Sequence, residues 1–161
     1  MIENFEHLYL LILHILMTAL FGIYTFRALF KPEGMVKEFN MDQSSVYIVR
    51  VLGTFVAPFF LIGIYLIFRP NGPEGAWVYY NLIFINFVIL SVYDAAVFLK
   101  KVDNDKGTKN SVTDLAVNTF TLISSIILIL GLSNKIYIWL PKIWLLSWID
   151  PSSILVVGRL K

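Results

Sequence analysis

The sequence predicts an all-α transmembrane four-helix bundle with a C-terminal, tryptophan-rich interfacial segment. Of its 161 residues, 58% are hydrophobic and 15% are charged, whereas roughly 25% of the residues of an ordinary soluble domain are charged. The mean hydropathy is +0.74, and the apolar residues gather in long stretches. A soluble bundle is disfavoured because its surface would also have to be apolar. The length predicts a single membrane domain over residues 1–161.

Four stretches are long enough to cross a bilayer, which takes about 20 residues of helix. They cover residues 7–26, 46–68, 76–99 and 112–132. We interpret the first as a retained span rather than a secretory signal, because Glu3 and Glu6 precede it and no Lys or Arg does. Pro32 and Gly34 interrupt the following loop, and residues 36–41 are expected to form one amphipathic turn at the membrane surface.

Aromatic residues mark two places at the membrane–water interface. The third span opens with three of them, Trp77, Tyr79 and Tyr80. The tail segment 136–149 has 14 residues with Pro141 and Lys142 at its centre, and it is too short and too broken to cross a bilayer. It contains three tryptophans, Trp139, Trp144 and Trp148. We expect this segment to be an interfacial anchor, with docking against a partner as the alternative.

The distribution of Lys and Arg predicts an orientation in the membrane. The loops of residues 27–45 and 100–111 together carry seven, whereas the opposite side carries five, four of them in the tail. The positive-inside rule therefore places both loops on the cytoplasmic side and both termini on the opposite side.

Charged and amide side chains within the spans define a candidate buried polar site near the cytoplasmic ends of the helices. It consists of Arg50, Asp94, Asp114 and Asn118. A carboxylate at mid-depth raises the free energy of insertion by roughly 2.5–3.5 kcal/mol, and pairing with Arg50 would offset much of that for one aspartate. The site is either a binding site for a proton, a cation or a headgroup, or an ion pair that fixes helix register. We favour the ion pair, and both interpretations predict that Arg50→Ala destabilises the bundle.

A second candidate polar layer lies near the middle of the membrane. It consists of His14, Asn86, Thr121 and Ser125. The polar residues of the fourth span recur at intervals of four, three and four, which places them on one helix face that should contact protein. We expect His14 to hydrogen-bond Asn86 or a Ser or Thr of that span. Metal binding is disfavoured because His7 and His14 lie about two turns apart along one helix.

Other chemistry is excluded or disfavoured by what the sequence lacks. It contains no cysteine, which excludes disulfides, thiolate catalysis and cysteine-ligated metals. It contains no GxxxxGK[ST], GxGxxG or GxSxG motif. We therefore predict no catalytic, cofactor-binding or metal-binding residues, no cofactor and no nucleic-acid partner. The expected partners are the lipid bilayer and other membrane protein subunits.

Two short motifs follow the first span and open the second. They are Phe30-Lys31-Pro32 and Arg50-Val51-Leu52-Gly53. Over roughly its first 100 residues the chain resembles a widespread group of small four-helix membrane proteins of unknown function, which have an aromatic-x-Pro after helix one and an Arg-x-x-Gly opening helix two. The resemblance implies a four-helix bundle and supplies no activity. The tryptophan-rich tail after Leu132 departs from that pattern.

Three functions fit these observations. The first is a structural or accessory subunit of a larger membrane complex, which the small size, the tryptophan-rich tail and the lack of a catalytic constellation favour. The second is an oligomeric carrier or channel component that uses the layer of Arg50 and the two aspartates. The third is a small membrane enzyme acting on a lipid or a quinone, with His14 or Asp94 as its base.

Overall fold

In a computed structural model of the chain, residues 3–102 and 112–137 are described. They form four long helices, α1 (Leu8–Phe30), α3 (Val46–Phe68), α4 (Trp77–Phe98) and α5 (Val112–Gly131), and two short ones, α2 (Pro32–Glu38) and α6 (Ser133–Ile136). Single 3-10 turns, η1 (Glu3–Phe5) and η2 (Gln43–Ser45), precede α1 and α3. These two ranges contain no strand, which confirms the all-helical prediction. Most of the predicted interfacial segment, residues 138–149, lies outside the described residues.

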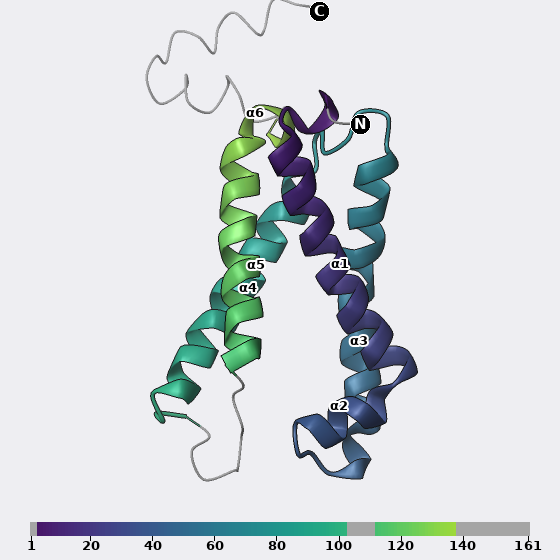
Figure 1. Cartoon of the computed structure of the whole chain (residues 1–161), viewed down its shortest axis with the longest axis vertical. Helices are drawn as coiled ribbons and strands as arrows, with labels where there is room; N and C mark the ends of the chain where they lie inside the picture. Colours follow the sequence, from purple (N-terminus) through teal and green to yellow (C-terminus); the bar gives the residue numbers. More distant parts are fainter. Residues whose placement is uncertain (1–2, 103–111, 138–161) are drawn as a thin grey trace, which may run out of the picture.

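The long helices form two antiparallel pairs (Figure 1). α3 packs along α1, α5 packs along α4, and α1 also contacts α5. The pairs converge at the end formed by η1, the loop of residues 69–76 and α6, which we call the closed end. They separate toward the end formed by α2, η2 and the last turn of α4, which we call the open end (Figure 1).

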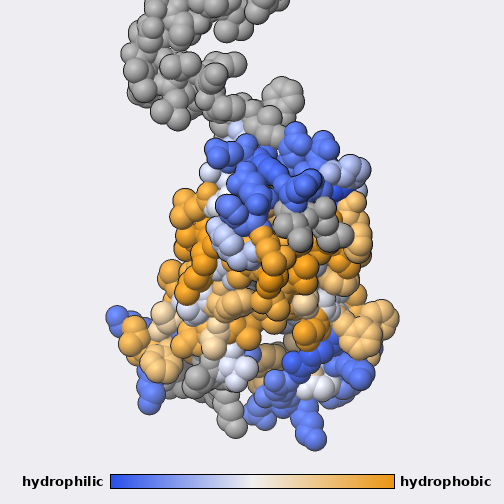
Figure 2. All heavy atoms as spheres, turned by 45° about the horizontal axis from the view of Figure 1, so that its top comes forward, coloured by the Kyte–Doolittle hydropathy of each residue, from blue (hydrophilic) through white to orange (hydrophobic). Residues whose placement is uncertain are grey.

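Apolar surface surrounds the middle of the molecule. On the face shown in Figure 2, it forms a band between two hydrophilic ends. Large apolar side chains on the long helices are exposed, among them Phe55 at 69% and Ile89 at 64%. All four long helices are long and apolar enough to cross a membrane. Together these features indicate a multi-pass membrane protein.

The predicted spans agree with the long helices, and the first differs at its end. α1 continues to Phe30, four residues beyond the predicted end at residue 26. It stops there because a proline disfavours the helical conformation in the residue before it, and Lys31 has φ −134° and ψ 48°. Pro32 then opens α2 from its first position. The amphipathic turn predicted over residues 36–41 therefore lies earlier, at Pro32–Glu38.

α1 and α3 pack closely because glycines of both helices lie at their contact. A β-carbon added at Gly22 would lie 2.6 Å from the ring of Phe60, and one added at Gly53 would lie 2.8 Å from the Cβ of Ala28. Small residues of this kind let two membrane helices approach each other. The close approach of the two backbones therefore depends on the missing side chains.

Hydrogen bonds hold the segments of the closed end together. The Nζ of Lys135 in α6 donates to the carbonyls of Glu3 and Asn4 at 2.7 and 2.9 Å. The side chain of Asn4 donates to the carbonyl of Pro70 at 2.8 Å. The backbone N–H of Gly75 donates to the carbonyl of Lys135 at 3.0 Å. These bonds join the start of the chain, the loop between α3 and α4, and α6.

Replacing Gly53 tests the close contact between α1 and α3. Gly53→Ala should lower the free energy of unfolding by about 1–3 kcal/mol, because the added carbon would lie 2.8 Å from Ala28, which moves only with its helix. Gly34→Ala is the control, since a β-carbon there has no neighbour within 4 Å and alanine favours a helix by about 1 kcal/mol. Reversible unfolding in detergent micelles measures both variants, and equal destabilisation would contradict the close contact.

Candidate functional site

His14 is the centre of a buried polar cluster in the half of the bundle next to the closed end. Its side chain is fully buried. Its Nε2 lies 3.0 Å from the carbonyl oxygen of Gly63 in α3, and its Nδ1 lies 3.1 Å from the hydroxyl of Tyr80 in α4. One imidazole therefore connects α1 with α3 and α4.

The two partners define the tautomer of His14. A backbone carbonyl only accepts hydrogen bonds, so Nε2 carries the proton and donates it to the carbonyl of Gly63. Nδ1 is then the acceptor, and the hydroxyl of Tyr80 donates to it. Full burial away from water favours this neutral side chain over an imidazolium.

Aromatic rings and a glycine enclose the imidazole. The ring centroids of Phe5 and Tyr79 lie 5.1 and 6.1 Å from its own. A β-carbon at Gly63 would lie 2.5 Å from the Oγ1 of Thr18 and 2.8 Å from the hydroxyl of Tyr79, so only glycine leaves room for these groups. The Tyr79 hydroxyl also donates to the carbonyl of Phe59 at 3.1 Å. These residues therefore form an enclosed contact between α1, α3 and α4.

The partners predicted for His14 are wrong. Thr121 and Ser125 are buried, but their hydroxyls donate to carbonyls of their own helix at 2.9 and 2.7 Å. Such internal bonds satisfy a hydroxyl without a second helix. Asn86 is exposed on α4 rather than directed into the bundle. Of the predicted central layer, His14 alone forms a hydrogen bond between helices within the described part of the chain.

Asp94 and Asn118 connect α4 to α5 toward the open end. The Nδ2 of Asn118 donates to the Oδ2 of Asp94 at 2.6 Å, and Asp94 is 7% exposed. Asp114 lies in the first turn of α5, one turn from Asn118, where the positive end of the helix dipole stabilises a carboxylate. The structure therefore brings Asp94 and Asn118 together, with Asp114 one helical turn along α5 from Asn118.

Arg50, the fourth predicted residue, belongs to the other helix pair. Its guanidinium lies 3.6 Å from the carboxylate of Glu33 in α2, and the two side chains are 53% and 57% exposed. Arg27 of α1 pairs with Glu38 of α2 in the same way. The predicted pairing of Arg50 with an aspartate is corrected accordingly. The separation of the helix pairs at the open end (Figure 1) leaves α2 as the nearer source of a carboxylate.

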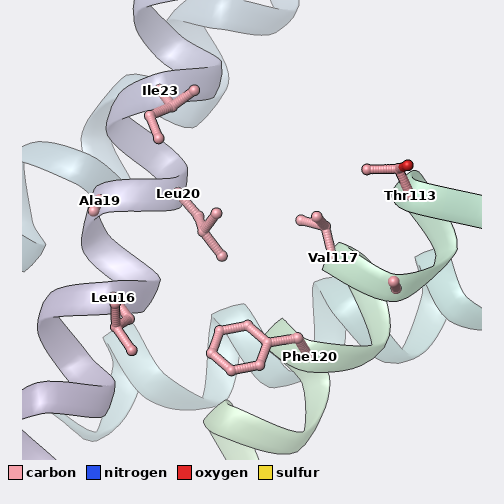
Figure 3. A pocket seen from close by; sticks show the side chains of 8 residues that line it. Leu16, Ala19, Leu20, Ile23, Thr113, Val117 and Phe120 are labelled. Atoms are coloured by element: carbon pink, nitrogen blue, oxygen red, sulfur yellow. The ribbon is translucent and has the colours of Figure 1, made fainter.

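A cleft of about 420 Å³ lies between α1 and α5. Its walls consist of apolar side chains and one threonine: Leu16, Ala19, Leu20, Ile23, Thr113, Ala116, Val117 and Phe120. Leu20 points across it toward Val117 and Phe120 (Figure 3). Neither His14 nor Asp94 lines this cleft, so the buried polar groups and the cleft are separate features of the bundle.

The described residues include no group of three or more His, Asp or Glu side chains placed to hold a metal ion. Comparisons with protein-family models, with curated proteins and with solved structures give no match for this chain. His14 and Asn118 hydrogen-bond one helix to another, whereas the hydroxyls of Thr121 and Ser125 bond within α5.

Tyr80 and Gly63 are the site residues that sequence reasoning missed. Tyr80 was interpreted as an interfacial aromatic because it lies in the first turn of its span. Depth along the helices is the signal that could have found it, since His14 and Tyr80 both lie within two turns of the helix ends at the closed side. No sequence pattern marks the carbonyl of Gly63 as an acceptor.

The contact between Asp94 and Asn118 should contribute more to stability than Arg50 does. Asn118→Leu removes the donor to a buried carboxylate and should lower the free energy of unfolding by about 1–3 kcal/mol. Arg50→Ala removes an exposed ion pair and should lower it by at most about 1 kcal/mol. Unfolding in detergent micelles compares the two, with Thr119→Leu as an exposed control on α5. A larger loss for Arg50→Ala would restore the Arg–Asp interpretation.

Proposed function

We propose that the protein is a structural or accessory subunit of a larger integral membrane complex, without a catalytic centre of its own. The exposed face of α4 supports this proposal. It consists of Leu82, Ile85, Asn86, Ile89, Val92 and Tyr93, which are all exposed and recur at helical spacing. This face is apolar except for Asn86 at its centre and the hydroxyl of Tyr93.

Asn86 is the single observation that carries the proposal. It lies at the middle of α4 (Trp77–Phe98), the depth at which a spanning helix is farthest from water. Its carboxamide has no hydrogen bond within the described part of the chain. Transfer of an unpaired amide into an apolar medium is unfavourable by roughly 2–7 kcal/mol, and polar side chains of this kind join membrane helices. The partner it fits is a spanning helix with a hydrogen-bonding side chain at the same depth.

The two alternative functions have less geometric support. A carrier or channel needs a water-accessible path past its charged groups, and the cleft between α1 and α5 is lined by apolar side chains. An enzyme acting on a lipid or a quinone needs an opening beside its base. His14 and Asp94 are 0% and 7% exposed, and the cleft does not reach either of them.

Asn86→Leu should detach the protein from its complex. After gentle detergent extraction from the native membrane, mass spectrometry should find other membrane proteins with the wild-type chain in stoichiometric amounts, and the variant should lose them because its helix face no longer offers the amide. Thr54→Leu is the control, since it makes the same kind of change on an exposed position of α3. A wild-type protein that purifies as a clean monomer or homodimer would contradict the proposal.

The proposed orientation places α2 and the loop of residues 100–111 in the cytoplasm and both termini on the other side, following the excess of Lys and Arg in these loops. The chain contains no cysteine, so one introduced cysteine is the single thiol of each variant that a maleimide can label. In intact cells, a membrane-impermeant maleimide should label Asn71→Cys at the closed end and should label Lys37→Cys only after permeabilisation. Both positions are exposed, and the reverse labelling pattern would invert the orientation.

A further inference from the structure

The cleft between α1 and α5 is open to its surroundings along one side. At the closed end the two helices meet closely, since a β-carbon at Gly131 would lie 2.7 Å from the Cδ2 of Leu10. Toward the open end they diverge (Figure 1). The side chains on its walls remain accessible, with Leu16 at 48% and Phe120 at 39% exposed.

Water is a poor occupant of this cleft. A water molecule needs several polar partners to remain in a cavity, and the walls offer one hydroxyl, that of Thr113. The cleft lies between two of the long apolar helices, at the level where the surrounding medium of a spanning helix is hydrocarbon. An acyl chain is therefore the group that matches both the walls and the surroundings.

The cleft and the residues beyond it follow a single stripe of α1. Leu16, Leu20 and Ile23 recur at helical spacing, and Arg27 continues the same stripe one turn further on. From Leu16 to Arg27 the helix rises about 16 Å, roughly half of the 30 Å hydrocarbon thickness of a bilayer. The stripe is thus apolar over the depth of one leaflet and ends in a cation at the surface.

The end of α1 carries more positive than negative charge. Arg27 pairs with Glu38, yet its side chain is 43% exposed, and a guanidinium has five donors in a fork that suits a phosphate. Lys31, the residue that follows the end of α1, is exposed, and its ammonium lies 6.0 Å from the ring centroid of Phe26. These two cations and one acid favour an anionic headgroup.

We propose that the cleft between α1 and α5 binds one acyl chain of an anionic phospholipid of the leaflet at the open end, with the phosphate held at Arg27. The apolar walls hold the chain, and the charged end of α1 selects the headgroup. This inference is independent of the exposed face of α4, so either proposal can fail without the other.

Native mass spectrometry of the purified full-length chain tests the binding. The protein is incubated with equal amounts of phosphatidylglycerol and phosphatidylcholine of the same chain length. The wild type should retain one lipid per chain and prefer phosphatidylglycerol. Ala116→Phe, which fills the cleft, should lose the bound lipid, and Ala19→Phe on the opposite wall is the second variant if the first does not fold. Arg27→Gln should keep a lipid and lose the preference for phosphatidylglycerol.

Leu61→Phe, at an exposed position of α3, is the control and should bind lipid like the wild type. Unchanged retention in folded Ala116→Phe and Ala19→Phe would overturn the assignment of the acyl chain to the cleft. A preference for phosphatidylglycerol that persists in Arg27→Gln would overturn the assignment of the headgroup. Equal loss in Leu61→Phe would show non-specific lipid around the helices and would also overturn the proposal.

Discussion

The neutral imidazole of His14 sets the arrangement of α1, α3 and α4. A buried polar side chain that is left unpaired lowers stability by about 1–3 kcal/mol, so each ring nitrogen requires a partner at its own depth. α3 supplies the carbonyl of Gly63 and α4 supplies the hydroxyl of Tyr80. A slide of one residue along any of these helices moves a partner by about 1.5 Å and breaks a bond. The hydrogen bonds therefore fix a register that apolar packing in a lipid solvent leaves loosely defined.

The hydrogen bonds of His14 lie toward one end of the molecule. The separation of the two helix pairs at the other end follows from this position. The closed end combines the contacts of His14 with the bonds of Lys135 to the start of the chain. At the open end, Arg27 and Arg50 hold α2 against α1 and α3, while the bond of Asn118 to Asp94 holds α5 against α4. The described residues have no ion pair between these two groups of helices at that end, which leaves the cleft between α1 and α5 accessible from the side.

Much of the fold could be predicted from the sequence, and little of the polar interior. Helix positions follow from the lengths of the apolar stretches, and Pro32 accounts for the one span boundary that differs by more than one residue. The periodicity of α5 correctly placed Thr121 and Ser125 on a buried face, but it could not show that their hydroxyls bond within α5. The sequence indicates only how deep along its span each residue lies, and on that basis it predicts Arg50 beside an aspartate. The structure places Arg50 on the other helix pair. Which helices are neighbours depends on packing, and one sequence does not contain that information in a readable pattern.

The tautomer of His14 is the most direct test of this account. Nitrogen NMR of the protein with labelled histidine, in detergent micelles or bilayers, distinguishes a protonated Nε2 from a protonated Nδ1 and both from an imidazolium. We predict one buried ring with a protonated Nε2 and an acceptor Nδ1. Tyr80→Phe should shift the Nδ1 signal, and Tyr65→Phe, at an exposed position of α3, should leave it unchanged. A protonated Nδ1, or an Nδ1 signal that stays the same in Tyr80→Phe, would contradict the hydrogen bonds that connect α1, α3 and α4.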